Sequence, residues 1–203
     1  MILAPQRILP VVVIDRADDA LPLGRALVAG GITTVEVTLR TPAGLDAIEA
    51  MAGVEGLTVG AGTVRNTDDV ARAVGAGAQF LVSPGFDRDL VGAAADHGVP
   101  ILPGIATASE AQAAFAVGLR AVKVFPAAVL GGPAFLRALS GPFPELQFWP
   151  SGGITQDTVE AYLAVPAVEA VCGSWMVERA MIVRQDWTLV EQLSRASIPK
   201  DLR

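Results

Sequence analysis

Two charged residues interrupt short apolar runs in this sequence. Glu36 stands between two valines, and Lys123 stands between two others. Alternate side chains of a β-strand face opposite sides, so in each run the valines face one side and the charged residue faces the other. Burying an isolated carboxylate or ammonium is costly, so each group requires a partner or must give up its charge. Both residues are therefore candidates for chemistry inside the fold.

A buried lysine beside a carboxylate can carry out Schiff-base chemistry. Burial disfavours the charged ammonium, and the neutral amine of Lys123 can attack a ketone to form an iminium. Glu36 could then move the protons that such a reaction requires. Arg40 ends the same run as Glu36, and an arginine there could hold a substrate carboxylate through two hydrogen bonds. The alternative is a purely structural Glu36–Lys123 ion pair, although buried pairs are poor net stabilisers.

A second candidate site lies in two glycine-rich segments near the end of the chain. Ser151, Gly152 and Gly153 follow one apolar run, and Gly173 and Ser174 end the next. Glycines let backbone N–H groups approach an oxyanion, and serine hydroxyls can add hydrogen bonds. Together these segments predict a phosphate site, although the Gly152–Gly153 pair by itself is more typical of a turn.

The elements that must position these residues alternate regularly. Eight apolar runs begin near Leu9, Thr34, Leu57, Gln79, Pro100, Ala121, Leu146 and Glu169. Each interval of about 21 to 25 residues accommodates one strand, one helix and two short loops. The pattern predicts a single-domain α/β fold over residues 1–203, a (β/α)₈ TIM barrel with Glu36 and Lys123 facing its interior. An open doubly wound sheet has the same alternation and is the alternative.

Helix boundary signals fit this reading of the chain. Thr41 and Pro42 predict the start of a helix that ends at Gly53. Thr107 and Glu110 form a capping-box pattern for the helix before Gly118.

Composition narrows the class of protein. The net charge of −6 argues against nucleic-acid or anionic-membrane partners. With one cysteine (Cys172, expected in the core) and one histidine (His97, expected on the surface), neither a disulfide nor a Cys/His metal site is expected. Residues 1–7 lack the features of a signal peptide, and no apolar run is long enough to span a bilayer. A cytoplasmic enzyme that uses no metal or other cofactor is the expectation.

Several short motifs, in order and at these spacings, resemble those of a known family. They cover nearly the whole chain: Val35-Glu36-Val37-Thr38-Leu39-Arg40-Thr41, Gly60-Ala61-Gly62-Thr63-Val64, Ser83-Pro84-Gly85, Pro103-Gly104-Ile105-Ala106-Thr107, Lys123-Val124-Phe125-Pro126-Ala127, Ser151-Gly152-Gly153-Ile154 and Gly173-Ser174-Trp175. The chain resembles the 2-keto-3-deoxy-6-phosphogluconate (KDPG) aldolases of the Entner–Doudoroff pathway, a family that includes the 4-hydroxy-2-oxoglutarate (KHG) aldolases.

The resemblance implies roles for individual residues. Lys123 would be the Schiff-base lysine and Glu36 the general acid and base. Arg40 and Thr63 would hold the pyruvyl carboxylate, with Pro84, Phe125 and Ser151 also in the substrate site. The phosphate would bind at Gly152, Gly153, Gly173 and Ser174. The resemblance also implies a homotrimer that takes a phosphorylated keto acid and releases pyruvate.

The activity implied is cleavage of 2-dehydro-3-deoxy-6-phosphogluconate to pyruvate and glyceraldehyde 3-phosphate. Cleavage of 4-hydroxy-2-oxoglutarate is the nearest alternative; a phosphate-binding barrel isomerase and a catalytically silent scaffold are more distant ones. Arg40 favours the gluconate-type members over galactonate-type relatives, which resemble Pro-Leu-Asn at this place. Two departures from the family pattern stand out: Ser151, where relatives often carry threonine, and a short N-terminus without the leading helix of some relatives.

Overall fold

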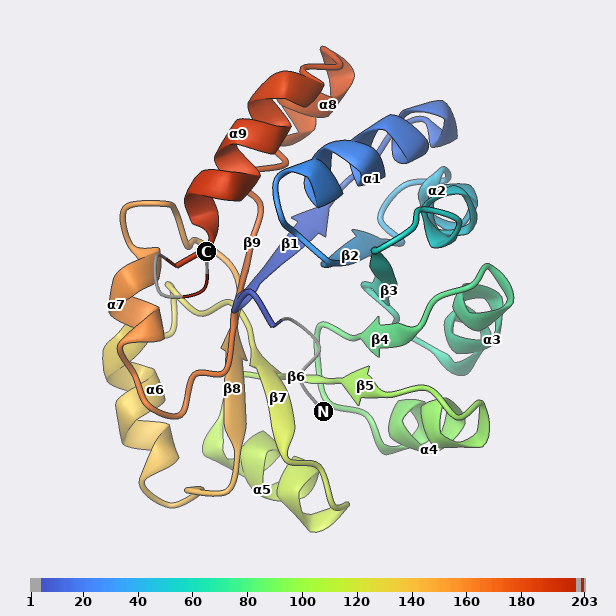
Figure 1. The fold of residues 1–203 in the computed structure, drawn as a ribbon. Coiled ribbons are helices and arrows are strands. Elements are labelled where there is room, and N and C mark those ends of the chain that lie inside the picture. The colour runs from blue at the N-terminus through green and yellow to red at the C-terminus, as the bar shows by residue number, and fades with distance from the viewer. Residues whose placement is uncertain (1–4, 200–201, 203) are drawn as a thin grey trace.

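A computed structural model describes residues 5–199 and residue 202 (Figure 1). The prediction about a signal peptide, and the one about the short N-terminus, fall partly on residues 1–4, which lie outside the described residues. None of the described helices is long and apolar enough to cross a membrane.

Each of the eight apolar runs forms β-structure where the sequence predicts it. The strands are β1 (Ile8–Val12), β2 (Thr34–Thr38), β3 (Thr58–Gly62), β4 (Phe80–Val82), β5 (Ile101–Leu102), β6 (Gly104–Ile105), β7 (Ala121–Val124), β8 (Gln147–Pro150) and β9 (Val171–Gly173). All their pairings are parallel. The β–α alternation predicted from the spacing of the runs is confirmed.

The sheet departs from the predicted eight-stranded barrel at the fifth run. Pro103, which has no N–H to donate, divides this run into β5, paired with β4, and β6, paired with β7. The result is a six-stranded sheet in the order β5-β4-β3-β2-β1-β9 and a three-stranded sheet in the order β6-β7-β8. Isolated parallel bridges join Phe148 to Val168 and Ser151 to Cys172, beside β8 and β9. The fold is therefore a curled parallel sheet in two parts.

Helices follow the strands and lie around the outside of the curled sheet (Figure 1). They are η1 (Ala17–Asp19), α1 (Ala20–Ala29), α2 (Gly44–Ala52), α3 (Thr67–Gly75), α4 (Arg88–Asp96), α5 (Ala108–Ala116), α6 (Gly132–Ser140), α7 (Val159–Leu163), α8 (Arg179–Val183) and α9 (Trp187–Ser197). The capping box of α5 is confirmed, because the Glu110 N–H donates to Thr107 Oγ1 and the Glu110 carboxylate accepts from the Thr107 hydroxyl.

The predicted start of α2 is wrong. The helix begins at Gly44, not at Pro42, and its N-cap Ala43 provides no side-chain cap. The Thr41 hydroxyl donates to the carbonyl oxygen of Ile14 at 2.5 Å, so the side chain is bonded to the loop after β1. A contact with the loop after β1 therefore overrides the local capping signal.

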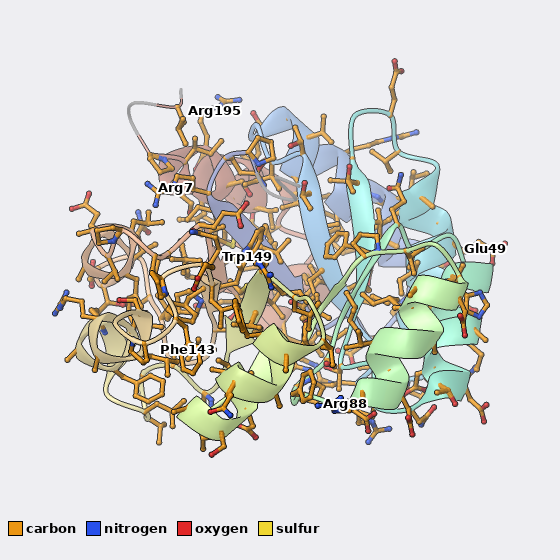
Figure 2. The ribbon with its side chains drawn as sticks, turned by 90° about the horizontal axis from the view of Figure 1, so that it is seen from below. Arg7, Glu49, Arg88, Phe143, Trp149 and Arg195 are labelled. Carbon is orange, nitrogen blue, oxygen red and sulfur yellow. The ribbon has the colours of Figure 1, made fainter. Side chains whose placement is uncertain are left out.

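Two layers of apolar side chains follow the alternation along the strands. The valines that flank Glu36 and Lys123 belong to the large cluster that also contains the helix residues. A smaller cluster fills the concave side of the sheet: Leu9, Val11, Phe80, Val82, Leu102, Trp149, Ala170 and Cys172. In Figure 2, Trp149 lies near the middle of the molecule, whereas Glu49, Arg88 and Arg195 lie at its edge. The prediction that the flanking valines face the helices is confirmed.

Candidate active site

Lys123 and Glu36 meet inside the curled sheet, as the alternation predicts. Lys123 Nζ lies 3.2 Å from Glu36 Oε1 and 3.3 Å from Oε2. Both residues are buried, Lys123 at 6% exposure and Glu36 at 1%. The Lys123 N–H donates to the carbonyl oxygen of Pro103 at 2.9 Å, which links β7 to the interruption between β5 and β6. The amine and the carboxylate are thus held in contact, away from bulk water.

Two glycines on β3 make room for side chains that lie against this strand. A Cβ added to Gly62 would lie 2.1 Å from Glu36 Oε1, and one added to Gly60 would lie 2.3 Å from the Phe80 ring. Both distances are far inside van der Waals contact. Gly62 therefore leaves the space that the Glu36 side chain occupies, and Gly60 leaves the space of the Phe80 ring.

A cavity of about 230 Å³ opens over the Lys123–Glu36 pair. It is lined by Val11, Glu36, Arg40, Thr63, Pro84, Lys123, Phe125 and Ser151. We call it the proximal cavity. It brings together the two predicted catalytic residues and all five residues predicted to bind substrate, whose roles stay predictions.

Two residues of the proximal cavity have distinctive geometry. Thr63 directly follows β3 and has φ of 61°, in the left-handed region that a residue other than glycine rarely adopts. Such backbone strain often accompanies functional sites. The Phe125 ring is 39% exposed, and its centroid lies 5.8 Å from Lys123 Nζ, within cation–π range. Phe125 thus provides an apolar wall beside the amine.

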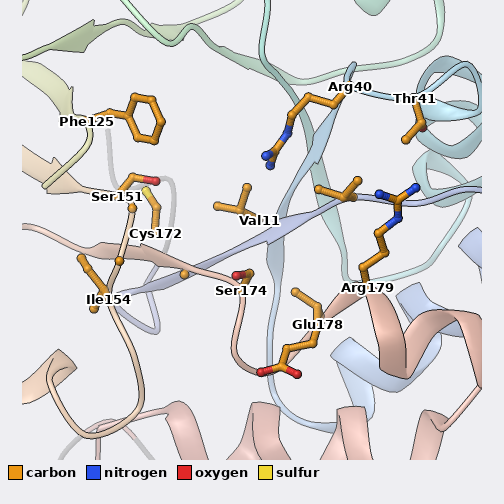
Figure 3. Close-up of a pocket in the computed structure, with 15 residues that line it drawn as sticks. Val11, Arg40, Thr41, Phe125, Ser151, Ile154, Cys172, Ser174, Glu178 and Arg179 are labelled. Carbon is orange, nitrogen blue, oxygen red and sulfur yellow. The ribbon is translucent and has the colours of Figure 1, made fainter. Parts of the chain in front are cut away.

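A larger cavity of about 500 Å³ adjoins the first and shares Val11, Arg40, Phe125 and Ser151 with it. We call it the distal cavity; Figure 3 shows its lining. All four residues predicted to bind phosphate line it: Gly152, Gly153, Gly173 and Ser174. Within the described part of the chain, no acceptor takes a hydrogen bond from the backbone N–H of Gly153 or Ser174. Free donors of this kind suit an oxyanion.

The loop after β8 depends on its glycines. Gly152 and Gly153 have φ of 95° and 74°, which favours glycine. A Cβ on Gly153 would lie 2.6 Å from the Cβ of Ala128. The N–H of Ala128 also donates to the Gly152 carbonyl oxygen at 3.1 Å. The loop after β7 therefore packs directly against the glycine pair and holds its backbone in place.

No sequence motif marks Glu178, Arg179 or Asp15 as site residues. Glu178 and Arg179 line the distal cavity. Arg179 donates from Nε to Asp15 Oδ2 at 2.7 Å and from Nη2 to Asp15 Oδ1 at 2.5 Å. The pKa of Asp15 is lowered below its ordinary value, mainly by these hydrogen bonds from Arg179. No local pattern links residues that stand 164 positions apart in the chain.

Cys172 and His97 lie where the composition predicted. Cys172 is 1% exposed, and burial raises the pKa of its thiol to about 12. His97 is exposed at the C-terminal end of α4. The described residues contain no group of three or more His, Cys, Asp or Glu side chains that could hold a metal ion.

Comparison with known proteins agrees with this geometry. The model of the family described as KDPG and KHG aldolase matches residues 1–193. A 2-dehydro-3-deoxy-phosphogluconate aldolase of Pseudomonas aeruginosa is 49% identical over 96% of this chain and 89% of its own length. A KHG/KDPG aldolase of Escherichia coli is 40% identical over 97% of this chain and 93% of its own.

Among solved structures, a KDPG aldolase from Legionella pneumophila superposes with a TM-score of 0.93 at 41% identity, covering 98% of this chain and 96% of its own. In that structure pyruvate was captured at low pH as a covalent carbinolamine intermediate. The chain described here therefore belongs to the KDPG and KHG aldolase family of lyases.

Proposed function

We propose that this chain is a metal-independent class I aldolase that cleaves 2-dehydro-3-deoxy-6-phosphogluconate to pyruvate and glyceraldehyde 3-phosphate. The observation that carries the proposal is the buried contact between Lys123 Nζ and the Glu36 carboxylate, at 3.2 and 3.3 Å, beneath the proximal cavity. A structural ion pair would not require a cavity above it lined by an arginine and a left-handed threonine. The carbinolamine in the Legionella relative supports the same chemistry.

The first half of the reaction forms an iminium. Lys123 first passes a proton from its ammonium to the Glu36 carboxylate, 3.2 Å away. The neutral Nζ then attacks the C2 ketone, and a proton passes from nitrogen to the alkoxide oxygen to give a hydroxyl. That hydroxyl is attached to the carbon bonded to Nζ, so it lies within reach of Glu36. Glu36 donates a proton to it, and water leaves together with the C–O bonding pair that the nitrogen lone pair replaces.

The second half of the reaction breaks the C3–C4 bond. Glu36, now a carboxylate, accepts the proton of the C4 hydroxyl, and the O–H electron pair forms the aldehyde carbonyl. The C3–C4 pair moves to C3 as the iminium becomes an enamine, which releases glyceraldehyde 3-phosphate. Protonation at C3 and addition of water to the imine then free pyruvate and restore Lys123.

The two cavities correspond to the two ends of this substrate. The pyruvyl end occupies the proximal cavity, where Arg40 and Thr63 hold its carboxylate and Pro84 and Phe125 enclose it. The phosphate occupies the distal cavity, where Gly152, Gly153, Gly173 and Ser174 supply N–H and hydroxyl donors. Ser151 lines both cavities, and so stands between the two ends of the substrate.

Trapping with borohydride tests the proposal directly. The protein is incubated with pyruvate and sodium borohydride, its intact mass is measured, and the modified peptide is mapped. We expect a stable pyruvate-derived adduct on Lys123 and none on Lys123→Ala. A folded protein that forms no adduct, or a Lys123→Ala variant that retains most activity, would contradict the Schiff-base mechanism.

A second candidate substrate is 4-hydroxy-2-oxoglutarate, which carries a carboxylate in place of the phosphate. The Escherichia coli relative is named KHG/KDPG aldolase, which supports activity on both. We propose the phosphorylated substrate as the preferred one because the distal cavity is larger than the proximal one and presents free backbone donors. The ratio of the two kcat/KM values decides between them.

We further propose that the two sheets close into a single-domain (β/α)₈ barrel and that the protein is a cytoplasmic homotrimer. The bridges beside β8 and β9 support closure of the barrel. A designed cage made by fusing symmetric oligomeric domains contains a region similar to this chain, with a TM-score of 0.81 at 27% identity, which supports an oligomer. Light scattering after size-exclusion chromatography measures the assembly state, and a monomeric mass would contradict the trimer.

A further inference from the structure

The distal cavity contains a cation that the family motifs do not include. Its lining has two arginines, Arg40 and Arg179. Arg40 also lines the proximal cavity, where the proposed function assigns it to the pyruvyl carboxylate. Arg179 lines the distal cavity and not the proximal one. If Arg40 is engaged by the carboxylate, Arg179 is the cation left in this lining to meet the charge of a phosphate.

The hydrogen bonds of Arg179 leave part of its guanidinium free. Nε and Nη2 donate to the two oxygens of Asp15. Among the described residues nothing accepts a hydrogen bond from Nη1, and the side chain is 61% exposed. Asp15 therefore orients the guanidinium through Nε and Nη2, and the N–H groups of Nη1 can still donate to an oxyanion.

The local fold keeps Arg179 beside the glycine-rich segment. Arg179 begins α8, five residues after Ser174, which directly follows β9. In the intervening turn the Val177 N–H donates to the Ser174 carbonyl oxygen at 3.0 Å. Asp15 lies in the loop after β1, the neighbour of β9 in the sheet. In Figure 3, Arg179 lies across the cavity from Ser151, with Ser174 between them. The pair therefore joins two adjacent loops at the rim of the cavity.

We infer that Arg179, oriented by Asp15, is a specificity-determining residue that binds the phosphate end of the substrate from the side opposite the glycine loop. The inference rests on the proposed function for the identity of the substrate. The glycine loop supplies neutral N–H donors, whereas Arg179 supplies a positive charge. Because the whole chain carries a net charge of −6, selection of a dianion needs such a local cation.

The test compares Arg179→Ala with the wild-type enzyme, using inorganic phosphate as the probe. A phosphate titration followed by ³¹P NMR reports the Kd without requiring turnover. Loss of a charge-assisted hydrogen bond should raise this Kd about tenfold. In cleavage of the phosphorylated substrate KM should rise by a similar factor while kcat changes little, because Arg179 does not line the cavity over Lys123.

Arg16→Ala is the matched control. Arg16 is an exposed arginine next to Asp15, paired with Asp18 at 3.3 Å, and it lines neither cavity. This variant removes the same charge close to the Asp15–Arg179 pair but outside both cavities, so it should change the phosphate Kd much less than Arg179→Ala does. Trapping of pyruvate by borohydride should be the same in both variants and the wild type.

The outcomes separate this inference from the proposed function. A phosphate Kd in Arg179→Ala that stays within about twofold of the wild type, or equals that of Arg16→Ala, overturns the role of Arg179. A wild-type protein that traps no pyruvate overturns the proposed aldolase function instead. The ³¹P titration still tests phosphate binding by Arg179 in that case.

Discussion

Gly62 offers the sharpest test of how the site is built. Glu36 occupies the space that a side chain at position 62 would fill. A Cβ there would lie 2.1 Å from Glu36 Oε1, 2.6 Å from Cγ and 2.7 Å from Cδ. In Gly62→Ala the carboxylate must therefore move by about 1 Å to reach even the shortest tolerable contact. Glu36 Oε1 now lies 3.2 Å from Lys123 Nζ. A movement of about 1 Å away from Nζ would lengthen this distance beyond that of a hydrogen bond.

The expected loss of activity is large relative to the loss of stability. A misplacement of about 1 Å can cost about 100-fold in rate, and general acid–base catalysis as a whole contributes about 10²–10⁴-fold. We therefore expect kcat for cleavage to fall about 100-fold in Gly62→Ala. Overpacking of a buried position costs about 1–3 kcal/mol, so the protein should remain folded.

The assay measures kcat for aldol cleavage together with unfolding in urea. Gly75→Ala is the control, because a Cβ at Gly75 has nothing within 4 Å and the residue ends α3 without a positive φ. It should keep wild-type activity and be unchanged or slightly more stable. Gly62→Ala with wild-type kcat would refute the conclusion that an empty position on β3 is what places Glu36.

Three further predictions concern charged and titratable groups. Lys123→Met should leave the Glu36 carboxylate buried without its cation, and should lower the free energy of unfolding, measured in urea at neutral pH, by about 3–5 kcal/mol. Adding Glu36→Gln should recover much of that stability but no activity. A Lys123→Met variant as stable as the wild type would contradict the buried pair. Cys172, whose pKa is raised to about 12, should react with a thiol reagent at neutral pH only after unfolding, so rapid labelling of the folded protein would show that burial does not suppress its thiolate. NMR titration should give Asp15 a pKa below its ordinary value of 3.8, and this pKa should rise in Arg179→Ala. Because the pKa is lowered in the folded state, ionised Asp15 stabilises the fold at pH values above 3.8, and this stabilisation is lost as the pH falls through the lowered pKa. An unchanged Asp15 titration in Arg179→Ala would contradict the ion pair.

Local pattern was enough to identify the elements and the reactive pair. Alternation along a strand depends only on backbone geometry, so the valines around Lys123 and Glu36 determine which way both charges face. Regular intervals between apolar runs likewise indicated strands and helices in the observed order. The Thr107–Glu110 capping box was predictable because all its partners lie within four residues of one another.

Contacts between distant segments decided the rest. The Thr41 side chain bonds to the carbonyl oxygen of Ile14, 27 positions earlier in the chain, and the helix begins at Gly44 instead. The division of the fifth run at Pro103 depended on which neighbouring strand each half could pair with. The space beside Gly62 forms only when β2 and β3 pair in register, and the Asp15–Arg179 pair forms only when the ends of β1 and β9 lie side by side.

By itself the sequence determined the direction in which each strand side chain points, because that is a property of a single strand. Only the tertiary structure decided which side chains share a cavity, because that depends on the register and curvature of several strands together.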